Sequence, residues 1–148
     1  MSAIVTEIEV DAPQAEVFEY VIDPTHFPQW QAGVTGGGLD HDGPPTVGSV
    51  CRTTRQIGGR ERSVTSTIVK YAPPNAWAVR GDDGPIRALI DVAVEPVAGT
   101  SRSRVRIAVD FTGHGIGKLL VPLVVRPQAR KEMPANLARL KERLESRN

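Results

Sequence analysis

The sequence predicts a single α+β domain in which an antiparallel sheet packs against one long C-terminal helix. Three observations support this fold class. Hydrophobic and polar residues alternate through much of residues 46–111, as they do in half-buried strands. Short connections with glycine join these runs, which favours antiparallel hairpins. Helical spacing occurs only briefly after the first strand and again over residues 117–147.

Length and composition agree with one globular domain spanning residues 1–148. The chain is 40% hydrophobic and carries a net charge of +1, so its totals predict no nucleic-acid-binding surface. Cys51 is the only cysteine, which excludes an intramolecular disulfide and fits a reducing compartment. The N-terminus has no secretory pattern, and the apolar run 119–125 is far shorter than the ~20 residues of a membrane span. We therefore expect a soluble cytoplasmic protein with no integral membrane segment.

The N-terminal region predicts one strand and two helices. Residues 3–10 alternate as a strand, and residues 12–22 switch to helical spacing after a capping Asp11. The motif DPTHF repeats the same start signal, so it predicts a second, very short helix that ends at Pro28. The following residues, 33–45, are rich in glycine and predict a flexible loop that acts as a lid.

Two hairpins and a last long strand follow. The first hairpin turns at Gly58-Gly59 and the second at Asp83-Gly84. A two-residue turn at Asp83-Gly84 predicts that Val79 pairs with Ala88, and Trp77 with Ile90. One face of the sheet is then apolar; it collects Trp77, Val79, Ile86, Ala88, Ile90, Val92, Val94, Val105, Ile107, Val109 and Phe111. In the first hairpin the inner side is less clear, and we assign to it Cys51, Thr53, Val64 and Ile68.

The C-terminal helix carries an apolar stripe with a conflict in its first half. The stripe consists of Leu119, Leu123, Met133, Leu137, Leu140 and Leu144. Prolines at 122, 127 and 134 predict a kink or break. Arg126 and Arg130 interrupt the stripe at heptad positions. One hypothesis is that an arginine binds a carboxylate or enolate of a ligand; the alternative, which we favour, is that both reach solvent.

Three segments together resemble the START-like helix-grip superfamily, also called SRPBCC. They are APQAEVFEYVIDPTHFPQW (12–30), GRERSVTSTIVKYAPPNAWAV (59–79) and NLARLKERLE (136–145). Within the superfamily, the chain is most similar to small bacterial polyketide cyclase/dehydrase-type proteins. The resemblance covers essentially the whole chain, and its motifs are specific for the fold but not for an activity. It implies about seven strands curved around the C-terminal helix, with an apolar cavity between them.

The resemblance also implies which residues bind a ligand. The segment DPTHFPQW would lie beside the cavity, so Phe27 and Trp30 would line it or close one end. The alternative is that Trp30 fills core volume beside Phe18. The expected ligand-binding residues are Phe27, Trp30, Trp77, Val79, Ala88, Ile90, Ile107, Val109, Phe111, Leu123, Arg126 and Arg130.

No catalytic or metal-binding motif stands out. His26, His41 and His114 lie in separate segments without ligand spacing, so we expect no metal and no cofactor. Candidates for catalysis are Arg126 and Arg130 for charge stabilisation, with His114 or Tyr20 for proton transfer. His114 is near enough in sequence to Asp110 to pair with it. The glycines of 113–119 fail the spacing of a phosphate loop and predict a turn from strand into helix.

The sequence is compatible with three functions. The first is a carrier that sequesters a hydrophobic small molecule, which needs no catalytic group. The second is an aromatase/cyclase-like enzyme acting on a poly-β-keto chain. The third is a protein-interaction domain that uses an outer arginine face formed by Arg80, Arg87, Arg102, Arg104 and Arg106. A homodimer is compatible with each of them.

Overall fold

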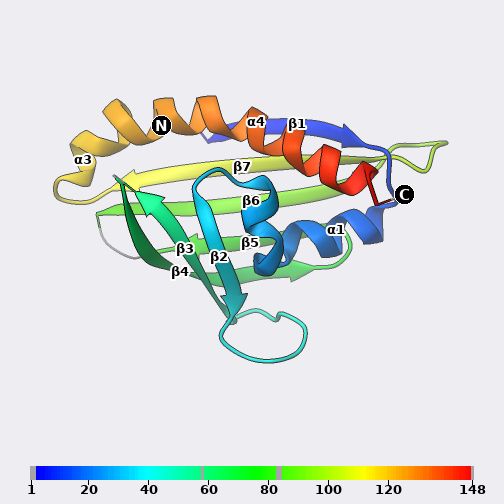
Figure 1. The fold of residues 1–148 in the computed structure, drawn as a ribbon, viewed down its shortest axis with the longest axis horizontal. Helices are drawn as coiled ribbons and strands as arrows, with labels where there is room; N and C mark the ends of the chain where they lie inside the picture. The colour runs from blue at the N-terminus through cyan, green and yellow to red at the C-terminus, as the bar shows by residue number, and fades with distance from the viewer. Residues whose placement is uncertain (1–2, 58, 83–84, 148) are drawn as a thin grey trace.

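The structure, a computed structural model that describes residues 3–57, 59–82 and 85–147, is one antiparallel sheet curved around a C-terminal helix (Figure 1). Seven strands build the sheet: β1 (Ile4–Val10), β2 (Val34–Leu39), β3 (Val50–Ile57), β4 (Arg60–Ala72), β5 (Ala76–Gly81), β6 (Ile86–Pro96) and β7 (Ser103–Gly113). Their order is β1-β7-β6-β5-β4-β3-β2, so the last strand, β7, pairs with the first, and β1 and β2 form the two edges of the sheet. The predicted helix-grip fold is confirmed.

Helical segments occupy the concave side of the sheet. They are α1 (Gln14–Ile22), η1 (Pro24–His26), α2 (Phe27–Trp30), α3 (Gly117–Leu120), η2 (Val121–Val125) and α4 (Arg126–Glu145). The helix α4 packs on β1 and α2, while α1 packs on β6. As Figure 1 shows, α3 lies at one end of the concave side, and α1 lies at the other end with the C-terminus.

The second hairpin has a different register from the predicted one. Val79 pairs with Ile90 and Trp77 with Val92, whereas Ala88 pairs with Gly81. The connection is therefore longer than a two-residue turn, and Asp83-Gly84 lies outside the described residues. A shift of two residues keeps every side chain on its face, because the side-chain period of a strand is two. The predicted apolar face is correct although its pairing was wrong.

The first hairpin agrees with its prediction. Ile57 pairs with Arg60 across a two-residue connection, in which Gly59 has a φ of 79° and Gly58 lies outside the described residues. Cys51, Thr53 and Ile68 are buried and Val64 is partly buried, which confirms the inner side assigned to this hairpin.

The glycine-rich segment was wrongly predicted to be a flexible loop along its whole length. Val34–Leu39 forms β2, which pairs with β3 at the edge of the sheet. A Cβ atom at Gly37 would lie 2.4 Å from the carbonyl oxygen of Pro24. The glycine is therefore required, because the turn of η1 packs directly on this strand.

Two helical predictions also needed correction. The second short helix does not end at Pro28, because Pro28 lies in the first turn of α2, where a missing N–H costs nothing. The stripe of the C-terminal helix was wrong in its first half: Leu119 is 64% and Leu123 is 71% exposed. Leu119 lies in α3 and Leu123 lies in the π-helical segment η2, which connects α3 to α4. A π turn holds more residues than an α turn, so the helical phase of α4 does not continue into α3.

Candidate functional site

The inner face of the sheet is fully buried at the end covered by α1 and the second half of α4. On β6 and β7, Val94 and Val105 are 0% exposed and Val92 is 4% exposed. The helix α4 packs Leu140 and Leu144 into the same core, both 0% exposed. Helical spacing brings these leucines to one face, where they complete the packing of the strands. We call this end of the concave face the closed half.

The same strands are incompletely covered towards α3. Ala88 and Ile90 of β6 and Phe111 of β7 point to the inner face but remain partly exposed to solvent. The side chain that α4 contributes here is Met133, which is also partly exposed. Apolar side chains on a concave face that solvent still reaches can contact a ligand without rearrangement of the core. We call this end the open half.

A buried cation heads α4 on the open side. Arg126 is 4% exposed, although we favoured the interpretation that it reaches solvent. It is seven residues before Met133 and therefore continues the buried stripe of α4. Arg130, by contrast, is exposed, as expected. Of the two arginines that interrupt the predicted stripe, only Arg126 is enclosed by the fold.

A second arginine on the inner face was missed by the sequence reasoning. Arg55 donates from Nε to Thr53 Oγ1 at 3.3 Å and from Nη2 to Gln31 Oε1 at 3.4 Å. Burial lowers the pKa of Arg55, and the nearby carboxylate of Glu132 on α4 opposes that shift. The signal was present, because Arg55 continues the alternation of Cys51 and Thr53 along β3.

The aromatic residues of DPTHFPQW belong to the core. Phe27 and Trp30 are 8% and 4% exposed, and their rings meet edge to face with centroids 5.9 Å apart. Trp77, on β5, is 3% exposed. Within the described part of the chain, the indole N–H groups of Trp30 and Trp77 are buried and have no hydrogen-bond acceptor. Such donors are unusual in an apolar interior.

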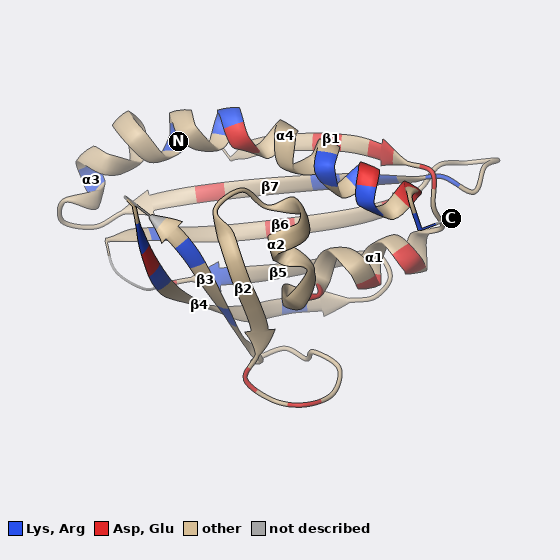
Figure 2. Cartoon of the chain, viewed as in Figure 1, with Lys and Arg blue, Asp and Glu red and all other residues tan. Residues whose placement is uncertain are grey.

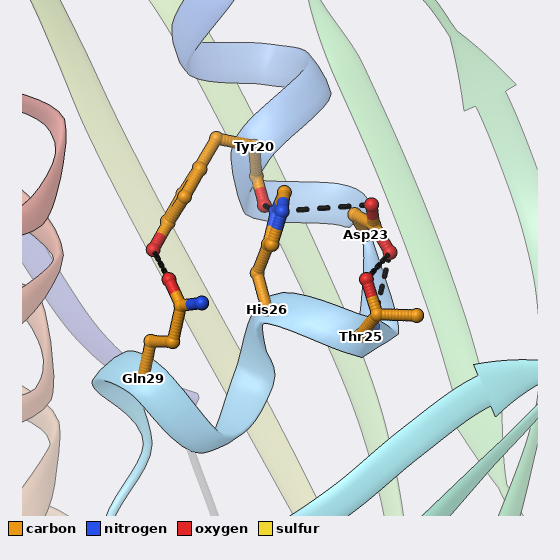
Figure 3. A network of polar contacts seen from close by, with 5 residues as sticks. All are labelled: Tyr20, Asp23, Thr25, His26 and Gln29. Carbon is orange, nitrogen blue, oxygen red and sulfur yellow. Dashed lines mark hydrogen bonds and ion pairs between the residues drawn. The ribbon is translucent and has the colours of Figure 1, made fainter. Parts of the chain in front are cut away.

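Tyr20 is held in a polar network at the closed end, shown in Figure 3. Its hydroxyl donates to Gln29 Oε1, its ring stacks on His26 with centroids 4.2 Å apart, and Arg147 lies over the ring. Burial raises the pKa of Tyr20, while Arg143 and Arg147 act in the opposite direction. The network joins α1, α2 and the end of α4, so Tyr20 fits a structural role better than proton transfer in the open half.

His26 and Asp23 complete this network (Figure 3). His26 Nδ1 lies 3.3 Å from the carbonyl oxygen of Tyr20 and 3.8 Å from the carboxylate of Asp23. Asp23 Oδ1 accepts hydrogen bonds from the backbone N–H and the hydroxyl of Thr25, at 2.9 and 2.7 Å. These bonds cap η1 and fix the connection between α1 and α2.

His114 lies away from the inner face. It is exposed and, with Asp110, lines a hollow of about 300 Å³ on the outer side of the sheet. Another hollow, of about 370 Å³, lies between α2 and the end of α4 and includes Gln29, Arg139 and Arg143. Neither hollow includes Arg126, so the structure does not bring the candidate proton donors together with the buried cation.

The remaining sequence candidates show no reactive arrangement. Burial raises the pKa of Cys51 to about 11, so its thiol is protonated at neutral pH. Among residues 3–57, 59–82 and 85–147, no group of three or more His, Cys, Asp or Glu side chains is placed to hold a metal ion. No helix in the described ranges is long and apolar enough to cross a membrane.

The outer arginine row is partly neutralised by the neighbouring strand. Arg104 lies 3.1 Å from Glu9 and Arg106 lies 3.4 Å from Glu7, in ion pairs between β7 and β1. These exposed pairs contribute little stability, but they reduce the positive field of the row.

Comparison with known proteins agrees with the fold. The profile of the family described as "Polyketide cyclase / dehydrase and lipid transport" matches residues 1–145. No curated protein is detectably similar in sequence.

Solved structures with low sequence identity share the whole fold. The aromatase/cyclase ZhuI from Streptomyces sp. R1128 superposes with a TM-score of 0.80 at 14% identity, covering 98% of this chain and 94% of that one. A START superfamily protein from Mycobacterium smegmatis gives 0.71 at 18% identity, with 99% and 97% covered. The di-domain aromatase/cyclase BexL of the BE-7585A biosynthetic pathway gives 0.77 at 20% identity; 98% of this chain is covered, which spans 47% of BexL.

Proposed function

Because the chain belongs to the polyketide cyclase/dehydrase and lipid transport family, we propose that it binds a hydrophobic small molecule, lipid or polyketide-like, in the open half of its concave face. The observation that carries this proposal is the change in burial along β6, from Val94 at 0% exposed to a partly exposed Ala88. The protein then acts as a carrier or sequestering protein.

Apolar contact alone can supply the affinity. Burial of apolar surface contributes ~25 cal/mol per Å², so a ligand that buries about 200 Å² gains roughly 5 kcal/mol before ordering costs. Ala88, Ile90, Phe111 and Met133 supply such surface without a catalytic group.

Arg126 favours a ligand with an acidic group. A buried guanidinium is costly unless anionic or hydrogen-bonding atoms surround it. A carboxylate or enolate oxygen of a ligand, placed against the open half, would add such a partner in a medium where charged hydrogen bonds are strong. Arg130, exposed on the same helix, cannot act in this way.

A larger side chain at Ala88 tests whether the ligand binds in the open half. We expect Ala88→Phe to weaken binding of a fluorescent apolar probe such as anilinonaphthalene sulfonate at least about tenfold, because the added ring occupies the open half. The matched control is Ala108→Phe on β7, which adds the same ring on the other face and should leave affinity within about twofold. Equal binding by the two variants would contradict the location.

Substitution of Arg126, with Arg130 as the control, tests whether the ligand carries an acidic group. We expect Arg126→Leu to lower affinity for an apolar acid about tenfold while affinity for its methyl ester is kept, since only the acid has a charge to pair. Arg130→Leu should change neither affinity. Native mass spectrometry of the purified protein would then identify any ligand that it retains. If Arg126→Leu weakens acid and ester equally, the arginine has no role in recognising charge.

A second candidate is an aromatase/cyclase-type enzyme. Arg126 supports it, because a buried cation beside an apolar surface could stabilise an enolate. Against it, His114 lies on the outer side and Tyr20 is engaged at the closed end. Incubation with a linear poly-β-ketone separates the two candidates: a cyclised product that is lost in Arg126→Leu would favour the enzyme.

A further inference from the structure

The exposed apolar residues of this protein concentrate in one short segment. Ile116, Leu119, Leu123 and Val124 are 65%, 64%, 71% and 57% exposed. In the rest of the described chain, large hydrophobic residues are exposed only at Val5 on β1, Val69 on β4 and Val47 in the connection between β2 and β3. We call the first four residues the apolar tip. A contiguous patch of this kind marks an interaction surface, whereas scattered residues do not.

The fold holds the apolar tip outward. On the opposite side of the same helical turns, Gly117 and Val121 are buried. A Cβ atom at Gly117 would lie 2.0 Å from the carbonyl oxygen of Pro85, so this side of α3 touches the backbone before β6. A rotation of this helical segment that buried Leu119 and Leu123 would break the contact between Gly117 and Pro85.

The charged residues of the helical segment that carries the apolar tip are all basic as far as Lys131, whereas the acidic Asp82 and Asp110 lie in the hollow beside His114. Residues 111–131 contain four basic residues and no Asp or Glu. Lys118, Arg130 and Lys131 are exposed, while Arg126 is buried. Figure 2 shows blue, basic positions on α3 and at the start of α4. In the sequence, the first acidic residue after Asp110 is Glu132.

We infer that the apolar tip and its flanking cations dock on the surface of an anionic lipid bilayer. Aliphatic side chains on one face of a short helical segment enter the boundary between headgroups and acyl chains, and exposed lysine and arginine side chains pair with anionic headgroups. The segment therefore combines exposed apolar side chains with nearby positive charges, the two features that strengthen binding to an anionic membrane interface. This inference stands on the outer surface of α3 and η2, and it does not depend on a ligand in the open half.

Charge complementarity separates a bilayer from a second copy of the chain. A symmetric dimer through the apolar tip would bring Lys118, Arg130 and Lys131 near their own counterparts, which is unfavourable. An anionic surface instead attracts all three. The tip also contains no aromatic residue of the kind that anchors protein–protein interfaces.

Vesicle flotation of the full-length protein tests the inference. We expect binding to phosphatidylcholine vesicles that contain about 30% phosphatidylglycerol, and at least about tenfold weaker binding to phosphatidylcholine alone. The double variant Leu119→Ser/Leu123→Ser should lower partitioning to the anionic vesicles at least about tenfold, with an unchanged melting temperature because both side chains are exposed. Lys118→Glu should lower it about fivefold.

Two controls make the result specific. Val47→Ser removes an apolar side chain that is 63% exposed but lies before β3, and it should bind vesicles like the parent protein. Ala88→Phe should also bind vesicles normally, so failure of the ligand site and failure of the docking surface can be told apart. The inference is overturned if the parent protein does not float, if the leucine variant floats equally, or if sedimentation shows a dimer that this variant dissociates.

Discussion

The two halves of the concave face use the same strands but differ in what the helices place above them. In the closed half, Leu140 and Leu144 of α4 cover Val94 and Val105, and each of the four is 0% exposed. In the open half, α4 presents Arg126 and Met133, and Ala88 is left partly exposed. The comparison teaches that the helices bury one half of the face completely, whereas in the other half they leave apolar side chains partly exposed to solvent.

The largest expected effect is the loss of folding stability when a side chain of α4 is shortened, and it should differ between the two halves. We expect Leu140→Ala to lower the free energy of unfolding by about 3 kcal/mol, because it opens a cavity in a fully buried site. Met133→Ala should cost about 1 kcal/mol, since Met133 is already partly exposed. Urea denaturation of both variants measures the difference. Equal losses would show that the open half is packed as tightly as the closed half.

Substitutions that enlarge a side chain should also destabilise the closed half more than the open half. Ala12→Leu, at a residue 2% exposed beside the closed half, should destabilise by about 2 kcal/mol through overpacking. Ala88→Leu should change stability by less than about 0.5 kcal/mol, because the open half has room for the added methyl groups. Thermal melts of the pair provide the measurement, and a cost at Ala88 as large as that at Ala12 would show that no room exists there.

The smallest expected effect on folding stability comes from the carboxylate of Glu145 at the closed end, which we call the carboxylate clamp. Glu145 Oε2 accepts hydrogen bonds from Lys141 Nζ at 2.7 Å and from the backbone N–H of Asp11 at 2.8 Å. The bond to Lys141, the bond from Asp11 and the charge of Lys141 outweigh desolvation, and they lower the pKa of Glu145 below its ordinary value of 4.5. A carboxyl group with a lowered folded-state pKa adds stability above that ordinary value and loses it as the pH falls through the folded value.

We therefore expect Glu145→Gln to cost only about 0.5 kcal/mol at neutral pH, because the ion pair with Lys141 is partly exposed to solvent, which screens it. Near pH 3 the difference from the parent protein should become smaller. Unfolding curves recorded at both pH values check the sign. A difference that grows in acid would contradict the clamp.

Local patterns were sufficient for six of the seven strands but not for β2. Alternation identified the inner face of β6 and β7 correctly, even though the pairing of β5 with β6 was displaced by two residues. Nothing in the glycines of Val34–Leu39 favours a strand. Strand β2 exists because β3 offers an edge to pair with and because Gly37 fits under Pro24.

The candidate site shows the same division. The strand residues of the open half could be predicted, since the side-chain period of a strand determines which face each residue occupies. Arg55 could have been found by continuing that period one step beyond Thr53. The burial of Arg126 and the exposure of Leu123 could not be predicted, because the π turn of η2 changes the helical phase between them.

The sequence by itself determined the strand faces, the core leucines of α4 and the order of the elements, because these follow from short-range periodicity against a single apolar core. Only the tertiary structure decided which half of the concave face is filled, which arginine is enclosed and which leucines face outward. Each of these depends on contacts between segments far apart in the chain, such as Gly117 with Pro85 and Gly37 with Pro24. Local spacing carries no information about such contacts, since the same helical stripe can face a sheet, a ligand or a membrane surface.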